Sequence, residues 1–255
     1  HSQVCLTLES NMKKPKLHVF GDSFSVSKDQ FLNSKIYLDT LGKYAAPEDV
    51  VSWIDLVMNK LKTTDRYVHA HYGVSNEWIF KKLIEEIKNI PEEDYVIVQT
   101  TSAARHWFFE DRPHYSNISG IRSEYFTKEE NNAIQTYLKY MQSDNLDNII
   151  WTSMVYTFEY IRNVSKCKIL VIPGWHNYPN VIGELNADVC DKEFENDAAR
   201  DKFYGKYEYF DPRLNHMSAN NHKILASKVV DWFQHNIPLN LTKDFETKIY
   251  TEKSI

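Results

Sequence analysis

The sequence predicts one α/β domain built on a mainly parallel sheet of about five strands, with helices on both faces. Two observations carry this prediction. Short apolar runs alternate along the chain with longer segments of helical periodicity, which is the pattern of repeated strand–helix units. The chain has 255 residues, enough to bury the core of one sizeable domain.

Three strands and two helices are expected in the first part of the chain. The strands are expected at 16–20, 66–71 and 94–100, and the helices at 50–61 and 77–90. In the first helix, the spacing of Trp53, Val57 and Leu61 indicates a face that packs on the sheet. The segment 27–48 has mixed polarity and no clear period. We therefore expect an irregular excursion there, bordering the site.

The second half is predicted to add a fourth strand and three helices. The helices are expected at 127–142, 146–162 and 219–235, and the strand at 168–172. Thr127 and Glu130 form a capping-box pattern, and Ser218 suits the N-cap of the last helix. The segment 181–210 is polar and has no assignable element.

Three segments follow from this pattern. Residues 1–11 show no periodicity and are expected to be a leader that is disordered or foreign to the natural chain. Met12 is expected to be the first residue of the natural chain. Residues 12–238 are expected to form the domain. Residues 239–255 are expected to be a polar tail, because Pro238 closes the last helical pattern.

Composition argues against several classes of function. The formal net charge is -5 and the basic residues are scattered, so we expect no nucleic-acid partner. Cys5, Cys167 and Cys190 are widely spaced and fit no metal-binding pattern, which predicts free thiols in a reducing, cytoplasmic compartment and no metal site. No apolar run reaches the roughly 18 residues of a membrane span. No glycine-rich dinucleotide or phosphate loop occurs, so no cofactor is expected.

The most informative segment is Gly21-Asp22-Ser23, which follows the first predicted strand. Ligands bind beyond the carboxyl ends of parallel strands, so a serine here would be both exposed and firmly held. Gly21 allows a sharp turn, and Asp22 can hydrogen-bond to the loop backbone. Two interpretations are open at this point: turn chemistry with a helix cap, or a nucleophilic serine.

A nucleophilic serine needs a base, and His216 is the best placed of the histidines. It lies just before the last predicted helix, from which a side chain can reach over the end of the sheet. Asp211 is the nearest upstream acid that could orient its ring. The alternative for His216 is a local hydrogen-bonding role in the loop.

Together these residues resemble the SGNH hydrolases, also called the GDSL esterase/lipase family. Gly-Asp-Ser-Phe at 21–24 matches the first block of that family, Gly73 in Tyr-Gly-Val-Ser-Asn is similar to the second, and His216 is similar to the fourth. The blocks occur in the family's order over residues 12–236. The resemblance implies a flavodoxin-like three-layer α/β/α sandwich and acyl transfer without a metal or an organic cofactor.

Two positions depart from the family's pattern. Its third block is usually Gly-x-Asn-Asp, whose asparagine donates to the oxyanion, whereas this chain reads Gln-Thr-Thr-Ser-Ala at 99–103. Ser102, by position, or Thr101 would supply a weaker hydroxyl donor, and loss of one such donor elsewhere costs about 10²- to 10³-fold in rate. The family's acid usually comes two or three residues before the histidine, where this chain has leucine and arginine. A Ser–His dyad, or an acid from elsewhere, is the alternative to Asp211.

The resemblance implies a serine esterase acting on an ester of a small molecule or of an acylated glycan, with a short acyl group such as acetyl favoured. Ser23 would attack the ester carbonyl, His216 would accept its proton, and the backbone N–H groups of Ser23 and Gly73 would stabilise the oxyanion. The alternatives are an acyltransferase with the same serine, and a non-catalytic binding or structural module that keeps the fold.

Further side chains are candidates for substrate binding because of their place at the predicted strand ends or in the aromatic and basic stretch after the third strand. They are Asp22, Asn76, Thr101, Arg105, Trp107 and Trp175. An arginine there suits an anionic substrate and a tryptophan suits stacking on a sugar. Core packing or a solvated charge is the alternative for each.

Overall fold

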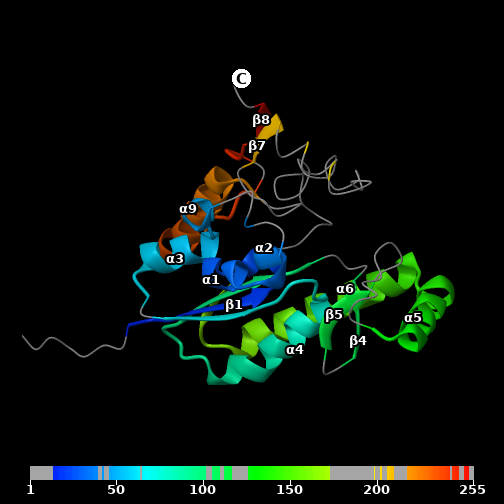
Figure 1. Cartoon of the computed structure of the whole chain (residues 1–255). Coiled ribbons are helices and arrows are strands. Elements are labelled where there is room, and N and C mark those ends of the chain that lie inside the picture. The colour runs from blue at the N-terminus through cyan, green and yellow to red at the C-terminus, as the bar shows by residue number, and fades with distance from the viewer. Residues whose placement is uncertain are drawn as a thin grey trace, which may run out of the picture.

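The structure is a computed structural model, shown as a cartoon in Figure 1. The residues that it describes are 14–39, 42, 46–63, 65–101, 105–109, 112–116, 126–172, 198, 202, 206–209, 217–241, 243–246 and 250–252. The expected leader, residues 1–11, lies outside them.

The core of the fold is a parallel sheet of four strands in the order β2-β1-β3-β6. These strands are β1 (Leu17–Gly21), β2 (Arg66–Ala70), β3 (Tyr95–Gln99) and β6 (Lys168–Ile172). Strand β1 is central, because Leu17 lies opposite Arg66 on one side and Tyr95 on the other. The prediction of a mainly parallel sheet is confirmed. About five strands were expected, and the described residues contain four strands of this sheet.

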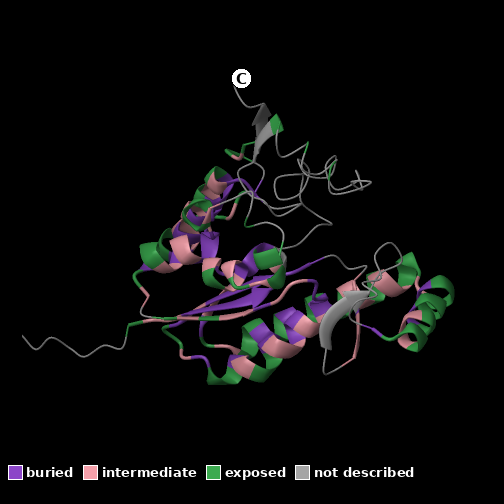
Figure 2. Ribbon diagram, viewed as in Figure 1, coloured by how far each residue is buried: buried purple, intermediate pink, exposed green. Residues whose placement is uncertain are grey.

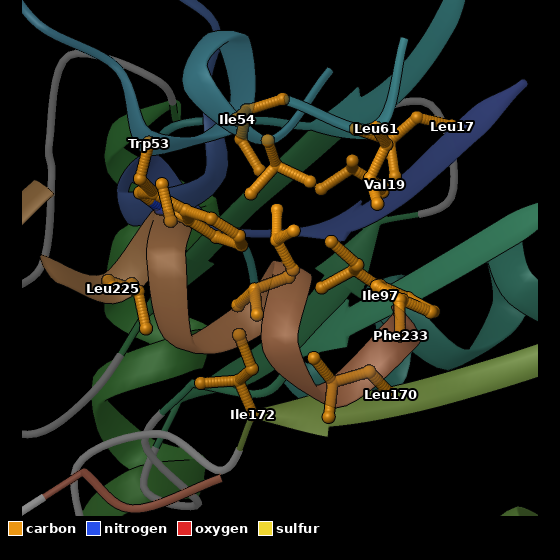
Figure 3. Packing of buried hydrophobic residues seen from close by; sticks show 14 of the residues in the cluster. Leu17, Val19, Trp53, Ile54, Leu61, Ile97, Leu170, Ile172, Leu225 and Phe233 are labelled. Carbon is orange, nitrogen blue, oxygen red and sulfur yellow. The ribbon is translucent and has the colours of Figure 1, made fainter. Parts of the chain in front are cut away.

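Helices pack on both faces of the sheet. Side chains alternate between the faces of a strand, and Leu17 and Val19 share a buried cluster with α3 (Trp53–Leu61) and α9 (Ala219–His235), drawn in Figure 3. Phe20 belongs to a second cluster with α4 (Asn76–Glu86) and α6 (Asp144–Val164). The two pairs of helices lie on opposite sides of the sheet in Figure 1, as the apolar runs of the strands predicted.

The segment 27–48, expected to be irregular, contains two short helices, α1 (Lys28–Leu32) and α2 (Lys35–Asp39). A 3₁₀ turn, η3 (Pro47–Asp49), follows them. Phe31 and Tyr37 pack in a small cluster with Val50. The expectation was wrong for the helical parts, because helices of this length are too short to show a helical period in the sequence.

A hairpin that the sequence did not indicate follows β3. It consists of β4 (His106–Phe109) and β5 (Arg112–Ser116), and α5 (Lys128–Met141) comes after it. In Figure 1 the hairpin lies at the end of the sheet where the strands finish. The capping box predicted for α5 is confirmed, since Thr127 Oγ1 accepts from the Glu130 N–H at 3.2 Å and Glu130 Oε2 accepts from the Thr127 N–H at 2.8 Å.

The segment after Pro238 is in contact with the core. Leu241 is buried in the cluster formed by α3 and α9. The Asn221 amide binds the backbone of Glu246 twice, accepting from its N–H at 2.7 Å and donating to its carbonyl at 3.0 Å. A strand at the end of the chain, β8 (Tyr250–Glu252), pairs with β7 (Tyr207–Tyr209). Part of the segment expected to be a polar tail therefore packs against the domain.

Burial follows the layered arrangement. Figure 2 shows the buried residues concentrated in the sheet and on the inner faces of the helices. Among the described residues, no helix combines the length and the apolar character that crossing a membrane requires.

Candidate active site

Ser23 lies two residues beyond the end of β1 and begins a single 3₁₀ turn, η1 (Ser23–Ser25). Every other residue from 17 to 27 is buried, whereas Ser23 is partly exposed. The turn is very tight, because a Cβ on Gly21 would lie 2.5 Å from Ser25 Oγ. Only glycine allows the chain to fold back so closely at this position.

Asp22 is fully buried, and both of its carboxylate oxygens accept hydrogen bonds. Oδ1 accepts from the Phe24 N–H at 3.0 Å and so caps the turn. Oδ2 accepts from Thr101 Oγ1 at 2.7 Å and from Arg105 Nη1 at 3.0 Å. The prediction that Asp22 holds the loop is confirmed. These bonds engage the carboxylate that is also a candidate for substrate binding.

Thr101 and Asn76 join the ends of two neighbouring elements. Asn76 Oδ1 accepts from the Thr101 N–H at 2.7 Å, and Asn76 Nδ2 donates to the Thr101 carbonyl at 2.8 Å. Both residues are almost completely buried. The amide therefore replaces a backbone partner where the chain leaves β3, and it holds this loop against the start of α4.

Arg105 forms a largely buried ion pair with Asp22. Its side chain is 14% exposed and that of Asp22 is 1% exposed. Arg105 Nη1 also lies 2.5 Å from Thr101 Oγ1. The guanidinium of Arg105, a candidate for binding an anionic substrate, is thus paired within the protein, where it offsets the cost of burying the carboxylate.

Gly73 lies in the loop between β2 and α4. Its φ of 63° is in the left-handed region that glycine adopts without strain. The N–H of His71 donates to the carbonyl of Gly21 at 3.3 Å, which joins the start of this loop to the end of β1. Ser75 Oγ accepts from the Trp78 N–H at 3.4 Å and caps α4.

Of two further contacts that the sequence analysis missed, one joins the Ser23 turn to α3 and the other joins α3 to α9. Trp53 Nε1 donates to the carbonyl of Phe24 at 2.8 Å. The backbone N–H of Trp53 donates to Nδ1 of His222, which is buried in α9. The imidazole thus caps α3 across 169 positions of sequence. The available signal in the sequence was the polar pair Asn221 and His222 at the start of a helix face that is apolar from Leu225 onward.

Ser25 and Gln99 form another buried contact beneath the turn. Ser25 Oγ donates to Gln99 Oε1. Both side chains are almost fully buried, although Gln99 ends an apolar strand. A polar residue at the end of such a strand was the available signal for this contact.

The β4–β5 hairpin carries Trp107, whose partner across the hairpin is Tyr115. Trp107 is half-buried. The preceding residue, His106, is buried between two carboxylates, with Nδ1 3.6 Å from Glu77 Oε1 and Nε2 3.5 Å from Asp147 Oδ1. These groups bring the hairpin close to α4 and α6.

Several predicted site residues lie outside the described part of the chain. They are Ser102, Trp175, Asp211 and His216. The residue after His216, Met217, is buried in the cluster of α3 and α9. Ser218 caps α9 as predicted, with its Oγ accepting from the Asn221 N–H at 3.1 Å.

The comparisons with known proteins leave the family open. No protein-family model matches this chain, and no curated protein matches it. Within the described ranges, no group of three or more histidine, cysteine, aspartate or glutamate side chains is arranged to hold a metal ion.

Proposed function

We propose that this chain is a serine esterase that hydrolyses an ester of a small molecule or of an acylated glycan. The observation that carries the proposal is the partly exposed Ser23, at the carboxyl end of the central strand in a run of buried residues. Ligands bind at this end of a parallel sheet. The turn is held by a buried carboxylate, which is the rigid support that a nucleophile needs. The resemblance to the SGNH hydrolases supports the same residue.

The proposed reaction has two halves. Ser23 Oγ forms a bond to the ester carbonyl carbon while His216 takes its proton, and the alcohol leaves with that proton when the ester C–O bond breaks. Water then attacks the acyl-enzyme, the carboxylic acid is released and the hydroxyl of Ser23 is restored. In this proposal Asp211 orients the ring of His216.

The developing oxyanion is proposed to bind the backbone N–H groups of Ser23 and Gly73. The tight turn at Ser23 and the left-handed Gly73 in the adjoining loop support this choice. Two hydroxyls were candidates for the third donor. Thr101 Oγ1 already donates to Asp22, so Ser102 is the better candidate.

Two finer features belong to the proposal. Numbered along the chain, the parallel strands have the order 2-1-3-4, which agrees with the first four strands of the flavodoxin-like order and supports that fold. A cytoplasmic location rests on the wide spacing of the three cysteines, of which Cys167 is a buried free thiol.

Covalent labelling with a fluorophosphonate probe tests the nucleophile. We expect labelling of the wild-type chain and none of Ser23→Ala. The matched control is Ser227→Ala, another partly exposed serine, on α9, and it should be labelled like the wild type. His216→Ala should slow labelling, because the serine loses its base.

Two further outcomes decide between the alternatives. A folded wild-type chain that neither reacts with the probe nor hydrolyses esters would overturn the proposal and favour a non-catalytic module. If labelling occurs, acyl release is compared with and without a sugar acceptor. Release that requires the acceptor would identify an acyltransferase and not an esterase.

A further inference from the structure

An apolar groove of about 450 Å³ lies between α4 and α6. Its apolar lining comes from Phe80 and Ile84 on α4 and from Ile149, Ile150 and Met154 on α6. Phe80 and Met154 belong to the core, but Ile84 and Ile149 are 48% and 62% exposed. The groove therefore leaves large aliphatic side chains in water at its rim.

Next to this groove, α6 carries a row of exposed residues that we call the α6 stripe: Ile149, Ser153, Tyr156 and Tyr160. The tyrosines are 73% and 61% exposed. The successive spacings are four, three and four residues, which keep the stripe on one side of the helix. Ile149 and Ser153 also line the groove, so stripe and groove form one continuous surface.

We propose that the α6 stripe packs antiparallel against the same stripe of a second copy of this chain. Its spacing reads the same in both directions. A two-fold axis between Ser153 and Tyr156 therefore brings Ile149 opposite the partner's Tyr160 and Ser153 opposite the partner's Tyr156. A small residue then meets a large one at the centre. Each copy then contributes the same four residues to the interface, as an isologous dimer requires.

The charge pattern of α6 permits this packing. The helix has no charged side chain from 148 to 158, so two antiparallel copies meet over this length without like charges opposing each other. Beyond it, Glu159 and Arg162 lie 3.5 Å apart on the same helix. The stripe is about 17 Å long at 1.5 Å per residue. Tyrosine suits such an interface, because dimer formation buries its ring while its hydroxyl stays in contact with water at the rim of the interface.

Sedimentation velocity on the full chain tests the proposal without any reference to Ser23. We expect the wild-type chain to form a dimer. Tyr156→Glu and Tyr160→Glu should each raise the dissociation constant at least about 10-fold, because each buries a charge at the centre or end of the stripe. Both side chains are exposed in the single chain, so these variants should fold. The control is Leu38→Glu on α2, which replaces another exposed apolar residue, and it should remain dimeric.

Cross-linking tests the register. One tagged chain carries Ile149→Cys and a differently tagged chain carries Tyr160→Cys. Oxidation of the mixture should yield a disulfide-linked dimer that carries both tags. Mixing either variant with the wild-type chain should give far less of that product. A monomeric wild-type chain, a dimer that the tyrosine variants leave intact, or the absence of the mixed disulfide would each overturn the antiparallel packing. A monomer would instead indicate an unrelated partner for the groove.

Discussion

Arg105 Nη1 lies 3.0 Å from Asp22 Oδ2, and this ion pair joins the loop after β3 to the turn that carries Ser23. The two residues are 83 positions apart. Thr101 binds the same carboxylate oxygen. The shape of the turn therefore depends on a contact that forms only when the sheet has assembled.

The first prediction concerns this pair. Arg105→Ala leaves the buried carboxylate of Asp22 without its counter-charge, which should lower the free energy of unfolding by about 3–5 kcal/mol. Arg105→Lys keeps a positive charge and should lose less. Urea denaturation measures both. The control is Arg162→Ala, which removes an exposed pair with Glu159 and should cost less than about 1 kcal/mol. An equal loss in Arg105→Ala and Arg162→Ala would contradict a stabilising role for the buried pair.

The second prediction concerns the close approach at Gly21. A methyl group added to Gly21 would place its carbon 2.5 Å from Ser25 Oγ and 2.8 Å from Ser25 Cβ, so Gly21→Ala should cost about 1–3 kcal/mol through overpacking. Ser25→Gly removes both of those atoms. The double variant should therefore lose less stability than the sum of the two single variants, and a double-mutant cycle by denaturation measures the difference. Strict additivity would mean that the two positions do not clash.

The sheet could be predicted from the sequence because each strand is a short apolar run between polar segments. Each of the four strands ends within one residue of its predicted limits. The β4–β5 hairpin could not be predicted. Its residues show neither strand alternation nor helical spacing, and the pairing between Trp107 and Tyr115 shifts register before Phe109.

The candidate site shows the same limit. The role of Asp22 in the turn was predictable, because its bond to the Phe24 N–H spans two positions. Its bond to Arg105 was not, because a pair far apart in the sequence leaves no periodic signal. For the same reason the sequence did not reveal that the imidazole of His222 caps α3.

The third prediction follows from the pKa of His69. Burial, the main cause, lowers the pKa of this histidine below its ordinary value of 6.5, with Glu86 opposing the shift. The unfolded chain therefore takes up a proton more readily than the folded chain. The free energy of unfolding should fall as the pH drops below about 6.5. Well above that value, His69 should add nothing to the pH dependence of stability.

His69→Phe tests this pH dependence. The ring of His69 stacks on Phe20 with centroids 4.8 Å apart, and phenylalanine keeps an aromatic ring there but cannot titrate. The loss of unfolding free energy between about pH 7 and pH 5 should be smaller in the variant, because the imidazole no longer takes up a proton on unfolding. Denaturation at several pH values measures the two curves. Parallel curves would show that His69 does not contribute.

The last prediction concerns the bond from Trp53 to the Ser23 turn. Trp53→Phe removes the indole N–H and leaves the buried carbonyl of Phe24 without this donor, which should cost about 1–3 kcal/mol. The loosened turn should also react more slowly with a fluorophosphonate if Ser23 is the nucleophile. The control is Trp232→Phe on α9, whose ring packs beside Lys168. It should leave the labelling rate unchanged whatever its effect on stability. If both variants slow labelling in proportion to their loss of stability, Trp53 has no specific part in positioning the turn.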